Sequence, residues 1–252
     1  NIASLLRPLG QKNFSSTEEM RRHLVETISL IRVDRHRENV VEFSIEKFDP
    51  TANFTRISGG SLGGKARGLA FARTMIENSE LNEKFPDVNI RVPKVLVIGT
   101  EEFDEFMRIN ELWEPALHAK SNDEITNLFL KSRFSRQLVQ SLKVYLSAIK
   151  YPIAVRSSSL LEDSQYQPLG GLYETYMLPN SDPSDKVRLS QLCEAVKRVY
   201  ASMFFQEPKS LMDISTHRHD EEKMAVIIQE LIGRNYGDRF YPSCSGVVQS
   251  YN

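Results

Sequence analysis

The sequence predicts an α/β fold, because segments of strand character alternate with segments of helical character. Apolar runs typical of buried strands occur within residues 91–99, 151–156 and 223–232. Apolar side chains elsewhere recur at the three- and four-residue spacing of amphipathic helices. Strands separated by helices are the pattern of an α/β domain. At 252 residues the chain is long enough for one or two domains.

The first 50 residues predict a helical arm that carries no recognisable motif. A capping-box pattern begins at Ser16, and apolar side chains follow at helical spacing in Met20, Leu24, Ile28 and Ile31. The charged run at residues 32–38 mixes acids with bases, which favours a solvated surface over a nucleic-acid patch. We therefore assign residues 1–50 to an arm or linker from an upstream region, and residues 51–252 to the domain itself.

The first half of the domain predicts a loop, a helix, a strand and a second helix. Residues 51–64 are rich in turn formers, and residues 65–78 are rich in strong helix formers. A strand follows within residues 91–99. Thr100 is then placed to cap a helix that begins with two glutamates.

The second half repeats this alternation. Ser121 starts another capping-box pattern, and helical period then runs from Phe134 to Ile149. After the strand at residues 151–156, Pro183 is expected at the first position of a long helix. Residues 223–232 then form the last clear strand. The apolar segment at residues 245–248 resembles the start of a further strand, so we expect the chain to be part of a longer protein.

The composition excludes several classes of protein. The formal net charge is -1 and the pI is about 6.6, so no overall field favours nucleic acid or an anionic membrane. Two cysteines are too few for a disulfide scaffold or a cysteine zinc site. No apolar run reaches membrane-spanning length, and the polar start lacks a signal-peptide pattern. We therefore expect a cytoplasmic protein with no nucleic-acid or membrane partner.

The glycine-rich segment before the helix at residues 65–78 predicts an anion site. Amides at a helix N-terminus, with a lysine beside them, can hold a phosphate, which makes Gly63, Gly64 and Lys65 candidates. Gly59, Gly64 and Lys65 also have the spacing of a P-loop, but Ala66 stands where a P-loop needs a Mg²⁺-binding hydroxyl. A tight turn with a solvated lysine is the purely structural alternative.

Arg156 ends a predicted strand, where ligands of α/β sheets bind, and its guanidinium can hold a second side of the same anion. Pairing with loop acids is the alternative for this residue. Gly170 and Gly171 precede Thr175 in a segment that fits either a mobile lid over a phosphate or a hairpin turn. The tract at residues 217–220 contains two histidines but fits a solvated loop, so we assign no metal ligands.

Read in order, these segments resemble the N-terminal nucleotide-binding domain of phosphoenolpyruvate synthase and pyruvate phosphate dikinase. The resemblance rests on residues 63–69, 154–163 and 170–175, and on the apolar strand at 225–232 that resembles the hinge strand of the family. It implies an ATP-grasp-like α/β (α+β) fold in which ATP lies between two lobes. Here the domain would be incomplete, lacking the second lobe.

The resemblance also implies a reaction and its residues. In this family the β-phosphoryl group of ATP passes to a carrier histidine on a separate domain, and from there to pyruvate. By position, Lys65 and Arg156 would be the catalytic residues and would hold the ATP phosphates together with Gly63 and Gly64. Gly170, Gly171 and Thr175 would close over the phosphates. Glu230 and Ile232 would meet the adenine.

The same resemblance sets the expected cofactors and partners. ATP and Mg²⁺ are the cofactors, and the family's metal-binding acids lie downstream of the segment matched by residues 245–248, so we expect no metal ligands in this chain and no turnover by it alone. Pyruvate and phosphoenolpyruvate would be partners through other domains, and association into a homo-oligomer stays open. A non-catalytic nucleotide-sensing or interaction module and a P-loop NTPase are the alternative functions.

Overall fold

The computed structural model describes residues 21, 40–46, 48–159, 171–214 and 222–248. The chain divides into two compact units, residues 1–40 and 41–252, and the fold described below is that of the second unit. The helix predicted after Ser16, the glycine at position 170 and the tract at residues 217–220 lie outside the described residues.

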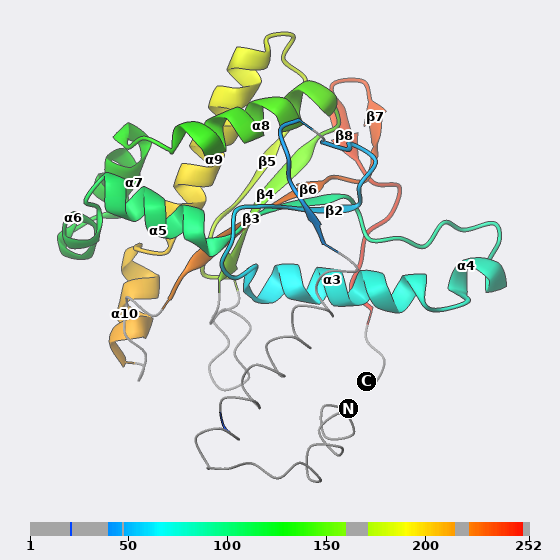
Figure 1. Cartoon of the computed structure of the whole chain (residues 1–252), viewed down its shortest axis with the longest axis horizontal. Helices are drawn as coiled ribbons and strands as arrows, with labels where there is room; N and C mark the ends of the chain where they lie inside the picture. Colours follow the sequence, from blue (N-terminus) through cyan, green and yellow to red (C-terminus); the bar gives the residue numbers. More distant parts are fainter. Residues whose placement is uncertain (1–20, 22–39, 47, 160–170, 215–221, 249–252) are drawn as a thin grey trace. The chain divides into compact units, whose positions relative to one another are not determined.

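A six-stranded mixed sheet forms the centre of this unit, with strand order β1-β2-β3-β6-β4-β5 (Figure 1). Strands β1, β2 and β3 are parallel, and β6 lies between β3 and β4 and runs antiparallel to both. Strand β5 pairs antiparallel with β4 at the edge of the sheet. The strands span Val41–Glu42 (β1), Phe54–Ile57 (β2), Val95–Ile98 (β3), Ile153–Ser159 (β4), Thr175–Leu178 (β5) and Met224–Glu230 (β6).

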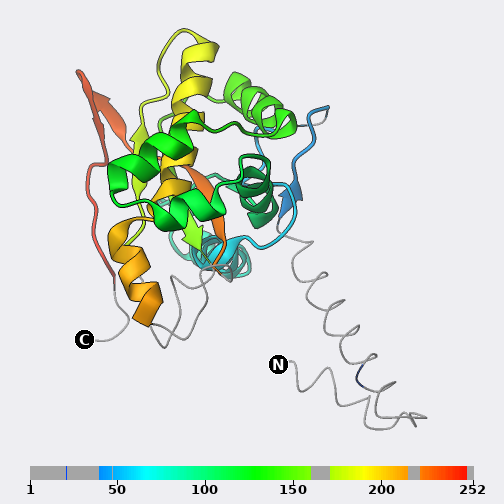
Figure 2. The ribbon, with the colours of Figure 1, turned by 90° about the vertical axis from the view of Figure 1, so that its left-hand side faces the viewer.

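Helices cover both faces of the sheet, as Figures 1 and 2 show. One face packs against α3, and the other carries a layer that includes α5, α7, α8 and α9. In the described residues no helix is long and apolar enough to cross a membrane. The helices span Gly63–Glu77 (α3), Leu81–Lys84 (α4), Thr100–Ile109 (α5), Trp113–His118 (α6), Asn122–Lys131 (α7), Arg136–Ala148 (α8), Asp185–Ser202 (α9) and Gln206–Ile214 (α10).

Strand alternation separates two groups of buried side chains. The main core beneath α8 and α9 includes Ile153 and Val155, and Tyr176 packs against it. Side chains at intervening positions, such as Ala154 and Ile227, are buried but lie outside that core. Because successive side chains of a strand point to opposite faces, this second group lies on the α3 face of the sheet.

The helices and the three apolar strands predicted between residues 60 and 232 are confirmed, with corrections at their ends. The strand predicted to end at Arg156 continues to Ser159, so Arg156 lies in its middle. Ser121 caps α7, since its hydroxyl accepts a hydrogen bond from Glu124 N at 3.2 Å. Thr100 is the first residue of α5 and not its cap. Pro183 precedes the cap of α9, Ser184, and is not the first helical residue.

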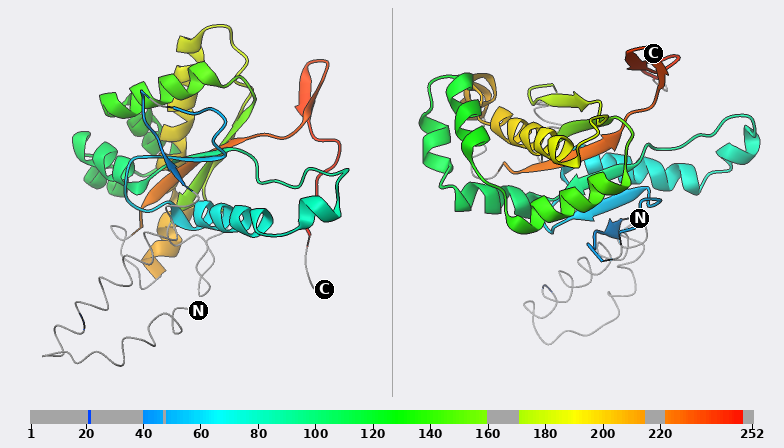
Figure 3. Two further views of the ribbon diagram at one scale, coloured as in Figure 1. Left: turned by 45° about the vertical axis from the view of Figure 1, so that its right-hand side comes forward. Right: turned by 90° about the horizontal axis from the view of Figure 1, so that it is seen from above.

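Other strand expectations from the sequence are wrong or incomplete, and β1 and β5 were not predicted. The stretch expected to be only turns contains β2, whose four residues are too few for a clear periodic signal. Residues 245–248 form no strand, and Val247 and Val248 are 90% and 96% exposed. A hairpin of β7 (Arg234–Tyr236) and β8 (Arg239–Tyr241) follows β6 and was not predicted (Figure 3).

Candidate functional site

The carboxyl ends of β2, β3 and β4 lie at one edge of the sheet, because these three strands run in the same direction. This edge therefore gathers the glycine loop after β2, the start of α5 after β3 and the serines that end β4. Ligands of open α/β sheets bind at such an edge. The glycine loop and the Arg156 segment, which the sequence predicts to converge, thus lie at the same edge of the sheet.

Gly63 brings α3 into direct contact with β4. Its φ is +75°, and a Cβ at this position would lie 1.7 Å from the carbonyl oxygen of Ser158. The hydroxyl of Ser158 donates to Leu62 O at 2.8 Å and accepts from Ala66 N at 3.0 Å. Ala66 itself is fully buried, so its methyl group takes part in packing. A P-loop needs a hydroxyl beside a phosphate at this position, whereas the side chain of Ala66 is a buried methyl group.

Two amides of the glycine loop are bound by side chains of α5. Gly59 N donates to Glu101 Oε2 at 3.0 Å, and Ser61 N donates to Thr100 Oγ1 at 2.8 Å. Thr100 N in turn donates to Ser61 O at 3.0 Å. The loop is thus fixed by α5, and these two amides do not form the phosphate cradle that a glycine run suggests.

Lys65 and Arg156 reach neighbouring positions on β4. The Lys65 ammonium donates to Ser157 Oγ at 3.1 Å, and Arg156 donates to Gln229 Oε1 at 3.2 Å. Since Arg156 and Ser157 are adjacent in a strand, their side chains leave β4 on opposite faces. Lys65 therefore contacts β4 one residue beyond Arg156, at a side chain on the opposite face of the strand from the Arg156 side chain.

Thr175 lies beside Arg156. It is the first residue of β5 and pairs directly with Arg156, so both side chains point to the α3 face. Gly171 is exposed with φ +83° and has open space around it. The residues between them are anchored, because Tyr173 is buried and Glu174 N donates to Ser202 Oγ at 3.1 Å.

Glu230 and Ile232 occupy the opposite end of the sheet from Lys65. Strand β6 is paired on both sides, so its last residue, Glu230, does not lie at a free strand edge. Glu230 N donates to Lys94 O, and Leu231 N donates to Pro152 O, both at 2.9 Å. Ile232 lies just beyond the sheet and is 49% exposed.

The carboxylate of Glu230 is held by an ion pair on the face away from Arg156. It accepts from Arg91 Nη1 at 2.9 Å and from Lys94 N at 3.2 Å. Burial raises the pKa of Glu230, but these hydrogen bonds outweigh it, and the pKa lies below the ordinary value of 4.5. The hydrogen bond between Arg91 and Glu230 also raises the pKa of Arg91.

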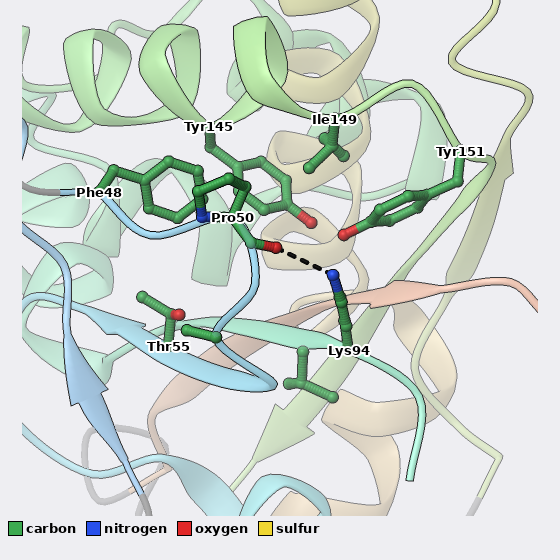
Figure 4. Close-up of a pocket in the computed structure, with 9 residues that line it drawn as sticks. Phe48, Pro50, Thr55, Lys94, Tyr145, Ile149 and Tyr151 are labelled. Carbon is green, nitrogen blue, oxygen red and sulfur yellow. Dashed lines mark hydrogen bonds between the residues drawn. The ribbon is translucent and has the colours of Figure 1, made fainter. Parts of the chain in front are cut away.

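A small pocket adjoins this ion pair (Figure 4). Lys94 Nζ donates to Pro50 O at 2.9 Å across its mouth, and the Tyr145 and Tyr151 hydroxyls face each other in its wall. Burial raises the pKa of both phenols. Its polar atoms are thus engaged in contacts within the protein.

The described residues contain no preformed cluster of metal ligands. No group of three or more His, Cys, Asp or Glu side chains in the described ranges could hold a metal ion. The acids nearest the glycine loop are already engaged: Glu101 with Gly59, and Glu102 with the Ser135 hydroxyl at 3.2 Å. Burial also raises the pKa of Glu102, which disfavours the ionised form that a metal requires.

The sequence missed the residues that hold the site together. Gln229 of β6 contacts Arg156 of the neighbouring strand β4. Glu101 of α5 contacts Gly59 of the glycine loop, 42 positions earlier in the sequence. No local pattern marks either contact, since each depends on which strands are neighbours. Three consecutive serines, Ser157 to Ser159, follow Arg156 in the sequence, but only the fold shows that Ser157 binds Lys65 while Ser158 binds α3.

Comparison with known proteins identifies a family. The family model described as "Pyruvate phosphate dikinase, AMP/ATP-binding domain" matches residues 60–252. No curated protein matches the chain. The matched range includes the glycine loop from Gly60, all of β4, and β6 with the residues that follow it.

Proposed function

Because the chain belongs to the pyruvate phosphate dikinase AMP/ATP-binding domain family, we propose that it is the ATP-binding part of a phosphotransferase of the phosphoenolpyruvate synthase and pyruvate phosphate dikinase type. In the proposed reaction, a phosphoryl group of ATP passes to a carrier histidine and then to pyruvate, both supplied by other domains. Lys65 and Arg156 hold the phosphates, and Ile232 contributes to the adenine site.

One observation carries the proposal: two cations from distant parts of the chain are brought to consecutive positions of β4. Lys65 is bonded to Ser157, and Arg156 precedes that serine in the strand. The long flexible stem of a lysine lets its ammonium move between partners, whereas the guanidinium offers a fixed planar set of donors. Together they can neutralise the charge of a triphosphate, which is the main task of a phosphoryl-transfer site.

Thr175 and Gly63 have supporting roles in this proposal. Thr175 pairs with Arg156 and points to the same face of the sheet, where its hydroxyl can donate to a phosphate oxygen. Gly63 lets α3 approach β4 closely enough for Lys65 to reach Ser157. Mg²⁺, when bound, would supply further charge neutralisation. We assign no described residue to it.

Titration calorimetry with ATP tests the proposal. We expect Lys65→Ala and Arg156→Ala each to weaken binding by about 1–3 kcal/mol, the scale of a lost charge-assisted hydrogen bond. Lys143→Ala, an exposed lysine on α8, is the matched control and should bind normally. Unchanged affinity in both site variants, with their circular dichroism intact, would contradict the assignment.

A further inference from the structure

We infer that the outer surface of α3 and of the segment after it binds the same surface of a second copy of the chain, with the two copies antiparallel. We call this surface the α3–α4 strip. It comprises the exposed side chains of residues 67–88, among them Arg67, Phe71, Met75 and Glu80. This pairing goes beyond the proposed function, because it requires no bound nucleotide.

Helix α3 is buried only in its first turn. Gly63 and Ala66 are its buried residues, and α4 after it has none. The end of α3 and the whole of α4 reach past the strands of the sheet, as Figures 1 and 3 show. Helix α9, in contrast, buries side chains from Arg188 to Ser202. Because most of the stability of a short helix comes from packing of its apolar face, the second half of α3 has no comparable support within the described part of the chain.

Apolar side chains are exposed along this strip. Phe71 is 67% exposed and Met75 is 56% exposed, and they share one face of the helix because they are four residues apart. Phe85 and Val88, after α4, are 54% and 56% exposed. Single exposed apolar residues are ordinary, whereas several along one projecting segment mark a binding surface.

The charges around the strip are segregated along the chain. Residues 63–73 carry three bases and no acid, whereas residues 77–87 carry four acids and one base. This order opposes the helix dipole, which favours acids in the first turn and bases in the last turn, and α3 has neither. A partner that brings acids to the start of α3 and bases to its end therefore offsets an unfavourable arrangement. The bases of the first segment are Lys65, Arg67 and Arg73, and the acids of the second are Glu77, Glu80, Glu83 and Asp87.

A second copy of the strip meets this requirement when it runs antiparallel. Its acidic end then lies beside the basic end of the first copy, and two-fold symmetry forms the same contact twice. A parallel copy would instead place like charges together. With the two-fold axis midway between Phe71 and Met75, Phe71 of each copy lies on Met75 of the other, and an aromatic ring packs well against a thioether. The same register brings Arg67 of each copy to Glu80 of the other.

The expected dimer is weak and reversible. The strip is short and has few apolar side chains, which places the interface at the small end of the range for specific complexes. The charges at its ends fix the orientation of the two copies more than they add affinity. Association should therefore depend on protein concentration, and added salt should weaken it.

Sedimentation velocity of the 252-residue chain tests the pairing. Over about 1–500 µM we expect the average mass to rise from that of a monomer towards that of a dimer. Phe71→Glu should raise the dissociation constant of the dimer by about ten-fold or more, because it puts a charge into the apolar contact. Val187→Glu makes a similar change at a 40% exposed side chain of α9 and is the control. It should leave the dissociation constant within about two-fold. Circular dichroism checks that both variants are folded.

Charge reversal tests the antiparallel register. Arg67→Glu and Glu80→Arg should each raise the dissociation constant about ten-fold, because each sets like charges opposite one another. The two substitutions in one chain reverse both members of each pair, so together they should return the dissociation constant to within about three-fold of its original value. Lys143→Glu, at an exposed lysine on α8, is the control and should have no effect.

The outcomes are distinct from those that bear on ATP. A chain that stays monomeric at about 500 µM overturns the inference. A dimer that Phe71→Glu leaves unchanged also overturns it, because its interface then lies elsewhere. If each single charge reversal weakens the dimer and the double reversal does not restore it, the antiparallel pairing is wrong. Binding of ATP is measured separately, so its presence or absence bears on the proposed function alone.

Discussion

Gly63 and Gly68 of α3 lie in different surroundings. Gly63 has a positive φ, and a side chain there would collide with the backbone of β4. Gly68 lies five residues on, with no positive φ, and a Cβ added there would meet no atom within 4 Å. Only Gly63 is therefore required for the approach of α3 to Ser158. Both glycines belong to the same motif in sequence, and only the environment separates them.

Alanine at these two positions should change stability in opposite directions. Gly63→Ala should lower the free energy of unfolding by about 2–4 kcal/mol, because it adds left-handed strain and a clash with a strand backbone. Gly68→Ala should raise it by about 0.5–1 kcal/mol, because alanine is the better residue inside a helix. Urea unfolding measures both. Equal effects of the two substitutions would mean that α3 does not approach β4 as described.

At the scale of elements, the long helices and the strands with continuous apolar runs were predictable, because their signals are local. Short strands were not: β2 has four residues and lies among turn formers, and β5 follows a segment whose glycines suggested a lid. The residues of the candidate site divide in the same way. Lys65 and Arg156 follow from local motifs, whereas the contact between α5 and the glycine loop depends on strand order.

The contact of α5 with the glycine loop predicts the effect of losing one hydroxyl. Thr100→Val keeps the shape of a buried side chain but leaves the Ser61 amide without its acceptor, which should cost about 1–3 kcal/mol of stability. Thr100→Ser retains the hydroxyl and should cost less than about 1 kcal/mol. Hydrogen exchange at the Ser61 amide should quicken in the valine variant alone. If serine and valine behave alike, the hydrogen bond is not what holds the loop.

At the scale of the whole unit, contacts between distant segments fix the order of the strands. The ion pair between Arg91 and Glu230 joins residues 139 positions apart, at the end of the sheet remote from Lys65. Sequence reasoning placed Glu230 beside the nucleotide. The register of β6 with β4 points its carboxylate to the core face, where it bonds Arg91 and the Lys94 amide just before β3.

This ion pair should make the unit less stable in acid. The folded pKa of Glu230 lies below its ordinary value of 4.5, so its contribution is complete above that value and is lost as the pH falls through the lower folded pKa. Glu230→Gln should therefore lower the free energy of unfolding at neutral pH by about 1 kcal/mol. Between about pH 5 and 3, the variant should lose stability less steeply than the unmodified chain. Thermal unfolding across this range measures the slope. Glu83→Gln, at an exposed carboxylate on α4, controls for the lost charge and should keep the original slope. A Glu230→Gln protein that loses stability in acid as steeply as the unmodified chain would show that another carboxylate governs acid unfolding.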